Sequence, residues 1–139
     1  MFERSFKGKR AILTADCCYS GGLALEALFR AGRISYAAVT SSQSGAESTG
    51  AWTFTDCLIS ALDGELGIDA DGDGSISLEE VAGYIERAMT RVDGQLASFV
   101  TTNGFPSRFV LGPARTMKQT PIDDFVEAEE GGEWPPVPG

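Results

Sequence analysis

The chain has 139 residues, of which 42% are hydrophobic and 22% charged, and this composition predicts one globular domain with its own core. Its net charge of -9 argues against a nucleic-acid partner, because phosphate binding needs clustered Lys and Arg, and the 11 basic residues form no run. No stretch approaches the roughly 20 apolar residues that cross a bilayer, and residues 1–7 contain no apolar signal core, so we expect a cytoplasmic protein with no membrane partner.

The first part of the chain predicts a strand, a helix and a second strand. Lys9–Cys17 contains a short apolar run with a basic start and a Gly-Gly pair beyond its end, which is typical of a buried central strand in a parallel sheet. Leu23–Arg30 follows as a helix, and Ile34–Thr40 is rich in β-forming residues. Such a unit implies a right-handed crossover, with functional loops at the carboxyl ends of the strands. We therefore expect Cys18 to share an edge with the loop that begins at Ser41.

The second part predicts two helices and a last strand. Apolar residues at helical spacing indicate a helix from Thr53 to about Leu62 and another from Leu78 to about Arg91. Ser107–Leu111 has the composition of a short strand, closed off by the Gly-Pro pair that follows. Beyond Lys118 the chain carries six acidic and no basic residues, a composition expected to stay unfolded. We therefore divide the chain into a lead-in, a domain and an acidic, proline-rich tail, at residues 1–8, 9–115 and 116–139.

The chain has three cysteines, and their spacing matches neither a zinc site nor a disulfide framework, so we expect reduced thiols. Cys18 follows the first predicted strand and precedes a helix, whose N-terminal partial positive charge favours an anionic nucleophile. A phosphatase loop is excluded, because Leu23 and Ala24 stand where its Arg is required. The chain has no histidine, the usual proton acceptor for a catalytic cysteine. The alternative is that Cys17 and Cys18 are small buried hydrophobic residues.

A short motif around Cys18 resembles that of a known protein family. Asp16, Cys18, Ser20 and Gly21 match Asp-x-Cys-x-Ser-Gly, and the segment resembles the active-site strand of the caspase-like clan, in particular metacaspases and bacterial caspase homologues. The Ser-rich loop after the next strand, the helix start near Phe54 and the later acidic segment extend the similarity. The resemblance implies a partial caspase-like α/β fold, with a mainly parallel sheet between helices in three layers (α/β/α).

By this resemblance the chain is the segment of a cysteine endopeptidase that carries the nucleophile. Cys18 forms an acyl-enzyme with a protein or peptide substrate, and Cys17 is a buried neighbour. Asp16 stands where metacaspase-like enzymes line the pocket for the residue before the cut, so an acidic wall implies cleavage after Arg or Lys. Ser41 and Glu47, from the loop after the next strand, are further candidates for this pocket. A helix cap or an ion pair is the alternative role for Asp16.

The chain also departs from the family pattern. In relatives the catalytic His and the first strands of the sheet lie before the Cys strand, so those strands are absent here. The Lys9–Cys17 strand is then left with an exposed hydrophobic edge, which proteins normally avoid. The resemblance therefore implies a partner segment or chain that supplies the His. The chain is a fragment or half of a split protease, a truncated product, or a pseudoenzyme completed by another protein; we favour the first two.

The acidic segment Asp69–Glu80 has the pattern of a twelve-residue EF-hand calcium loop. Acidic residues stand at positions one, three, five and twelve, and Gly74 supplies the turn at position six. The candidate ligands are Asp69, Asp71, Asp73, Ser75 through its carbonyl, Ser77 through a water, and Glu80. We therefore predict a structural or regulatory Ca2+ site and no organic cofactor.

Two alternatives remain open. Ser77 and Glu80 also form a capping box for the last long helix, so the loop is alternatively a turn without metal. If Cys17 and Cys18 are chemically inert, calcium binding or a scaffold role is the only activity. The interpretations differ in one observable, because a nucleophilic Cys18 reacts with a thiol-directed reagent faster than Cys57 does.

Overall fold

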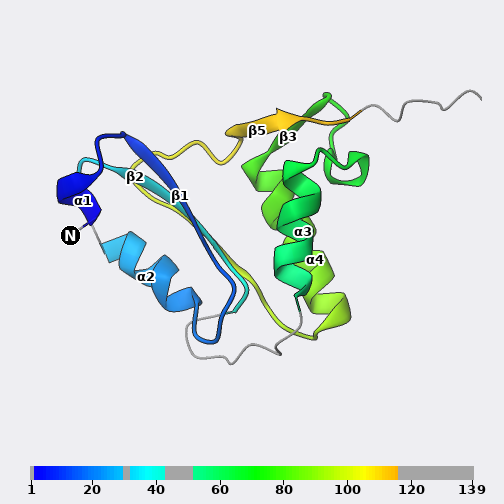
Figure 1. Cartoon of the computed structure of the whole chain (residues 1–139), viewed down its shortest axis with the longest axis horizontal. Helices are drawn as coiled ribbons and strands as arrows, with labels where there is room; N and C mark the ends of the chain where they lie inside the picture. Colours follow the sequence, from blue (N-terminus) through cyan, green and yellow to red (C-terminus); the bar gives the residue numbers. More distant parts are fainter. Residues whose placement is uncertain (1, 30–31, 43–51, 116–139) are drawn as a thin grey trace, which may run out of the picture.

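The computed structural model describes residues 2–29, 32–42 and 52–115 (Figure 1). Its elements, in chain order, are α1 (Phe2–Ser5), β1 (Arg10–Ala15), α2 (Gly21–Phe29), β2 (Ser35–Thr40), α3 (Thr53–Leu62), the 3-10 turn η1 (Leu66–Ile68), β3 (Ser75–Ser77), α4 (Leu78–Val92), β4 (Ser98–Thr101) and β5 (Val110–Pro113). The predicted strand-helix-strand unit and both later helices are confirmed, with small shifts at their ends. The predicted tail and the loop residues 43–51 lie outside the described residues.

The main sheet has the strand order β1-β2-β4. β1 and β2 run parallel, with Arg10 opposite Ser35 and Ala15 opposite Thr40. β4 was not predicted, and it pairs antiparallel with β2. The described sheet is therefore mixed, and the expectation of a mainly parallel sheet is corrected by this third strand.

β1 differs from the buried central strand that its sequence predicted. Its residues alternate between exposed and half-buried, because among the described residues it pairs with β2 alone and so forms an edge of the sheet. The strand also ends at Ala15, before Asp16 and Cys17. The central strand is β2, which is fully buried from Tyr36 to Thr40.

Helices cover both faces of this sheet (Figure 1). On one face, Ala27 of α2 packs with Ile34 and Tyr36, and Phe6 of the lead-in packs against the same cluster. On the other face, Ala37 and Val39 belong to the larger core that α3 and α4 fill. The buried members of that core from the helices are Phe54, Cys57, Ala61, Leu78, Val81, Ile85 and Met89. The fold is thus a small α/β domain, and each fully buried large apolar side chain stabilises it by about 1.5–3 kcal/mol.

A second, two-stranded sheet joins the acidic loop to the end of the domain. Ile76 of β3 lies opposite Gly112 of β5, and the strands are antiparallel. The last strand was predicted at Ser107–Leu111 and begins at Val110 instead. Pro113 lies at its end, where a missing N–H costs least. Among the described helices, none is long and apolar enough to cross a membrane.

Candidate functional site

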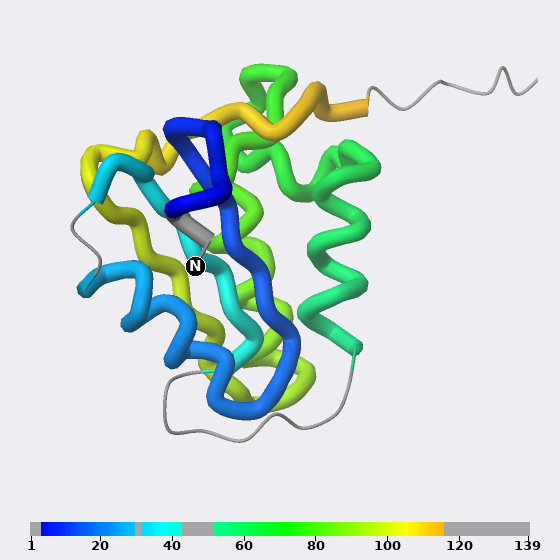
Figure 2. The backbone as a smooth tube through the Cα atoms, turned by 60° about the vertical axis from the view of Figure 1, so that its left-hand side comes forward, coloured from blue at the N-terminus to red at the C-terminus, as the bar shows by residue number. Residues whose placement is uncertain are grey.

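The carboxyl ends of β1 and β2 meet at one edge of the main sheet, as predicted. The N–H of Ser41 donates to the carbonyl of Ala15 at 3.0 Å, and the hydroxyl of Ser42 donates to the carbonyl of Cys17 at 3.0 Å. In Figure 2 the turn after β1 and the end of β2 lie at the same end of the sheet. The edge therefore gathers Cys18 and the first residues of the serine-rich loop.

Cys18 occupies the turn between β1 and α2, and its side chain is exposed. Cys17 is also exposed, which corrects the expectation of a buried neighbour: β1 ends two residues earlier, so Cys17 belongs to the turn and not to the sheet. Cys57 is the buried thiol, and desolvation, followed by the nearby acidic groups Asp56, Glu65 and Asp93, raises its pKa. The three thiols thus divide into two accessible ones and one protected one.

Asp16 is held by helix α3. The hydroxyl of Thr55, in the first turn of α3, donates to Asp16 Oδ2 at 2.6 Å, and both side chains are half-buried. This contact spans 39 residues of sequence. It fixes one carboxylate oxygen next to the cysteine turn, and it ties α3 to this edge of the sheet.

The two other predicted pocket residues fall differently. Ser41 is 0% exposed, its carbonyl accepts from Gln95 Nε2 at 2.8 Å, and its hydroxyl is buried without a hydrogen-bond partner. In the described structure a substrate therefore cannot contact Ser41. Glu47 lies outside the described residues. Gln95, itself buried, anchors the end of β2 from the loop after α4.

The acidic loop closes around its own carboxylates. Asp69, Asp71 and Asp73 each offer an oxygen, and these oxygens lie within 4.8 Å of one another. The N–H of Gly74 donates to Asp69 Oδ2 at 3.0 Å, and the N–H of Gly72 donates to Asp69 Oδ1 at 2.8 Å. Gly74 has a φ of +85°, so the turn predicted at position six is confirmed. Clustered carboxylate oxygens of this kind are the ligands that Ca2+ prefers.

Glu80 joins the end of the loop to its beginning. The predicted capping box is present: Glu80 Oε2 accepts from the N–H of Ser77 at 2.9 Å, and the N–H of Glu80 donates to the Ser77 hydroxyl. Glu80 Oε1 accepts from the N–H of Ala70 at 2.8 Å. Desolvation raises the pKa of Glu80, but the hydrogen bonds from Ser77, Asp71 and Ala70 outweigh it, and the pKa lies below its usual value.

Several residues of these sites were not predicted. Arg108, from the segment between β4 and β5, forms an ion pair with Asp71. Thr55 belongs to the helix start near Phe54 that the resemblance singled out, but its contact with Asp16 was not predicted. Gln95 lies in the loop after α4, and nothing in the local sequence marks it. Ser42 had a local signal, because it follows Ser41 directly in the serine-rich loop at the end of a predicted strand.

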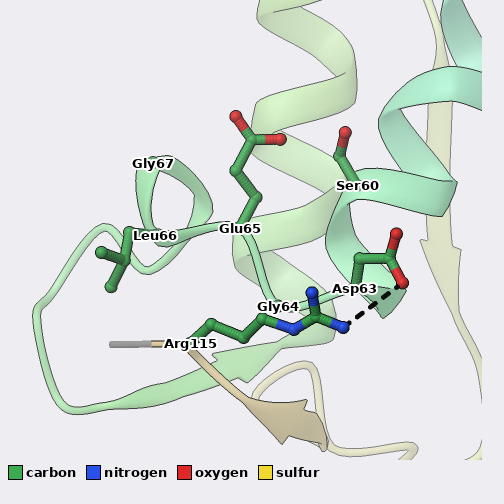
Figure 3. A pocket seen from close by; sticks show the side chains of 7 residues that line it. All are labelled: Ser60, Asp63, Gly64, Glu65, Leu66, Gly67 and Arg115. Atoms are coloured by element: carbon green, nitrogen blue, oxygen red, sulfur yellow. Dashed lines mark ion pairs between the residues drawn. The ribbon is translucent and has the colours of Figure 1, made fainter. Parts of the chain in front are cut away.

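An open pocket of about 450 Å³ lies where α3 ends, and Figure 3 shows its lining. Arg115 extends over it, with Nη2 3.8 Å from Asp63 Oδ1, and the N–H of Arg115 donates to the carbonyl of Gly64 at 2.7 Å. None of the predicted site residues lines this pocket. Arg115 pairs there with Asp63, and its backbone binds Gly64, so we assign these contacts the structural task of fixing the end of β5 to α3.

No protein-family model, no curated protein and no solved structure matches this chain. A functional assignment therefore depends on the residues and contacts described above.

Proposed function

We propose that this chain carries the nucleophile of a caspase-like cysteine endopeptidase, with Cys18 attacking the scissile carbonyl to form an acyl-enzyme. The observation that carries the proposal is the exposure of Cys18 on a strand-to-helix turn at the carboxyl edge of the sheet. A thiol there is open to substrate, and in this proposal the backbone N–H of the nucleophile donates to the oxyanion. The base takes the thiol proton, the S–C bond forms, and the carbonyl oxygen becomes an oxyanion. When this intermediate collapses the C–N bond breaks and the amine leaves with the proton that the base took, and water then hydrolyses the thioester, which releases the acid and the Cys18 thiol.

Asp16 supports cleavage after Arg or Lys. Its carboxylate lies two residues before the nucleophile and is oriented by Thr55. A fixed carboxylate next to the reacting group attracts a basic side chain more strongly than an acidic one. Cleavage after Asp is the specificity that this side chain disfavours.

The proton acceptor comes from a partner segment in this proposal, because the chain has no histidine. The edge of β1 supports such a partner. In the described sheet β1 pairs only with β2, and Ile12 of this edge strand is 37% exposed. An added strand would satisfy the N–H and C=O groups of the edge. It would also extend the sheet toward that of a caspase-like fold, in which the sheet is the middle of three layers.

The acidic loop is proposed as a structural or regulatory Ca2+ site, with Asp69, Asp71, Asp73 and Glu80 as carboxylate ligands. The close approach of the three aspartate oxygens supports this assignment. Ser75 would contribute its carbonyl and Ser77 a bound water. The protein is proposed to act in the cytoplasm, where its three cysteines, none of them in a disulfide, stay reduced.

Cleavage of fluorogenic peptides ending in Arg, Lys or Asp tests the endopeptidase proposal. The chain is assayed alone and mixed with the polypeptide encoded immediately upstream, with and without calcium. We expect turnover after Arg or Lys in the mixture, loss of turnover in Cys18→Ala, and retention in Cys17→Ala. Turnover that survives Cys18→Ala contradicts the proposal.

Calorimetric titration with CaCl2 tests the second site independently. We expect binding by the unmodified chain and its loss in Asp69→Asn, while Glu86→Gln, an exposed glutamate of α4, binds as before. If calcium binds and no mixture cleaves any peptide, the inert calcium-binding module is the better description. If neither is observed, both proposals fail.

A further inference from the structure

One oxygen atom, Ser42 Oγ, binds the main chain on both sides of Cys18. It donates to the carbonyl of Cys17 at 3.0 Å and accepts from the N–H of Ser20 at 3.0 Å. The same two peptide groups also face each other, since the N–H of Ser20 lies 3.2 Å from the carbonyl of Cys17. Cys18 therefore lies on a turn whose two ends are joined through a side chain of the neighbouring strand's loop.

The hydrogens of this network have one consistent arrangement. Ser42 has a single O–H, and the carbonyl of Cys17 takes it, so in the 3.0 Å contact between the two hydroxyls Ser20 is the donor. Ser20 Oγ in turn accepts from the N–H of Ser42 at 3.1 Å. Ser42 is 0% exposed and Ser20 is 4% exposed, so water does not compete for these bonds.

The turn also contains an unfavourable backbone conformation. Tyr19 has a φ of +59°, in the left-handed region that a residue with a Cβ seldom adopts. Tyr19 stands between Cys18 and Ser20, so the bonds made by Ser20 restrain the strained residue directly. Such strain persists only where several surrounding contacts hold the residue in place, and strained residues are frequent at functional sites.

We propose that Ser42 is a positioning residue, which together with Ser20 holds the strained turn that presents the Cys18 thiol at the start of α2. The inference rests on the proposed role of Cys18 as nucleophile. Ser42 touches neither the thiol nor a substrate in this account, and it acts through the peptide groups at both ends of the turn.

The test is the rate at which iodoacetamide alkylates Cys18 in the full chain, measured by mass spectrometry in a Cys17→Ser background. We expect Ser42→Ala to slow alkylation about fivefold, the effect of losing one net hydrogen bond. Ser42→Thr keeps the hydroxyl and stays within about twofold of the parent. Ser35→Ala is the matched control, because Ser35 also donates to a carbonyl, that of Asn103 at 2.9 Å, from the opposite end of β2.

A rescue variant separates positioning from a general loss of stability. Tyr19→Gly removes the strain, because glycine adopts a positive φ without a Cβ clash. Added to Ser42→Ala, it restores the alkylation rate if Ser42 acts by holding the turn, and it also keeps the test valid where Ser42→Ala alone folds poorly. Absence of rescue overturns the inference.

The remaining outcomes distinguish this inference from the proposed function. If Cys18 in the folded parent reacts no faster than in the urea-unfolded parent, the nucleophile proposal itself fails. If Cys18 reacts faster in the folded parent and Ser42→Ala leaves that rate unchanged, only the positioning role of Ser42 fails.

Discussion

The guanidinium of Arg108 pairs with the carboxylate of Asp71, the residue at the third position of the acidic loop. Arg108 therefore brings one positive charge to a group of carboxylates that includes Asp69 and Asp73. A calcium ion in this loop would compete with the guanidinium for Asp71. Because both partners of the pair are well exposed, the ion pair is worth at most about 1 kcal/mol and yields to a multiply charged ligand.

Arg108→Gln is thus expected to raise calcium affinity by about two- to fivefold, the amount set by an exposed ion pair. Isothermal titration with CaCl2 measures the effect. Arg91→Gln removes the same charge at the far end of α4 and serves as the control. Equal affinity gains in both variants would mean that net charge, and not the contact with Asp71, governs binding.

Thr55→Val should destabilise the domain by about 1–2 kcal/mol, because it leaves the half-buried Asp16 carboxylate without this donor while keeping the shape of the side chain. Urea unfolding measures the change. Thr90→Val, at an exposed position of α4, is the control and is expected to stay within about 0.5 kcal/mol. A Thr55→Val domain as stable as the parent would show that the contact adds no stability.

The sequence predicted the features that a few neighbouring residues determine. The helix at Thr53–Leu62 follows from its apolar spacing, and the capping box follows from Ser77 and Glu80, three residues apart. The turn at Gly74 follows from a loop pattern that requires a positive φ. The shared edge of β1 and β2 also follows from local elements, because the two strands of a strand-helix-strand unit run parallel and so end at the same edge of the sheet.

The features that sequence reasoning missed depend on distant partners. β4 has only four residues, and it is a strand because β2 offers it an edge. Arg108 meets Asp71 across 37 residues, and Gln95 meets Ser41 across 54. The exposure of Cys17 depends on where the pairing of β1 ends. No periodicity or spacing within one segment carries such information.

Gly64→Ala should destabilise the domain by more than about 1 kcal/mol, since a Cβ at a φ of +80° is strained and would lie 2.7 Å from the carbonyl oxygen of Pro113. Gly67→Ala, in the same pocket lining, is the control: its φ is not positive and its Cβ would meet nothing within 4 Å. Thermal unfolding compares the two variants. If both lose stability equally, the close approach of β5 to Gly64 is not what holds this end of α3.

Glu80 should make the domain sensitive to acid. Because its pKa is lower in the folded state than the ordinary value of 4.5, the carboxylate stabilises the fold above pH 4.5, and that contribution is lost as the pH falls through the folded pKa. Glu80→Gln should therefore be less stable than the parent at neutral pH, with the difference shrinking below pH 4.5. Urea unfolding in the presence of EDTA, at several pH values, measures this difference without calcium.

Ser77→Ala provides the matched comparison for the same effect. It removes the hydroxyl that donates to Glu80 Oε2 at 2.8 Å but leaves the backbone donors of Ser77, Ala70 and Asp71 in place. The acid-dependent loss of stability should therefore be smaller than in the parent but still present. A difference between Glu80→Gln and the parent that stays constant from neutral to acid pH would mean that the hydrogen bonds to the Glu80 carboxylate do not favour its charged form.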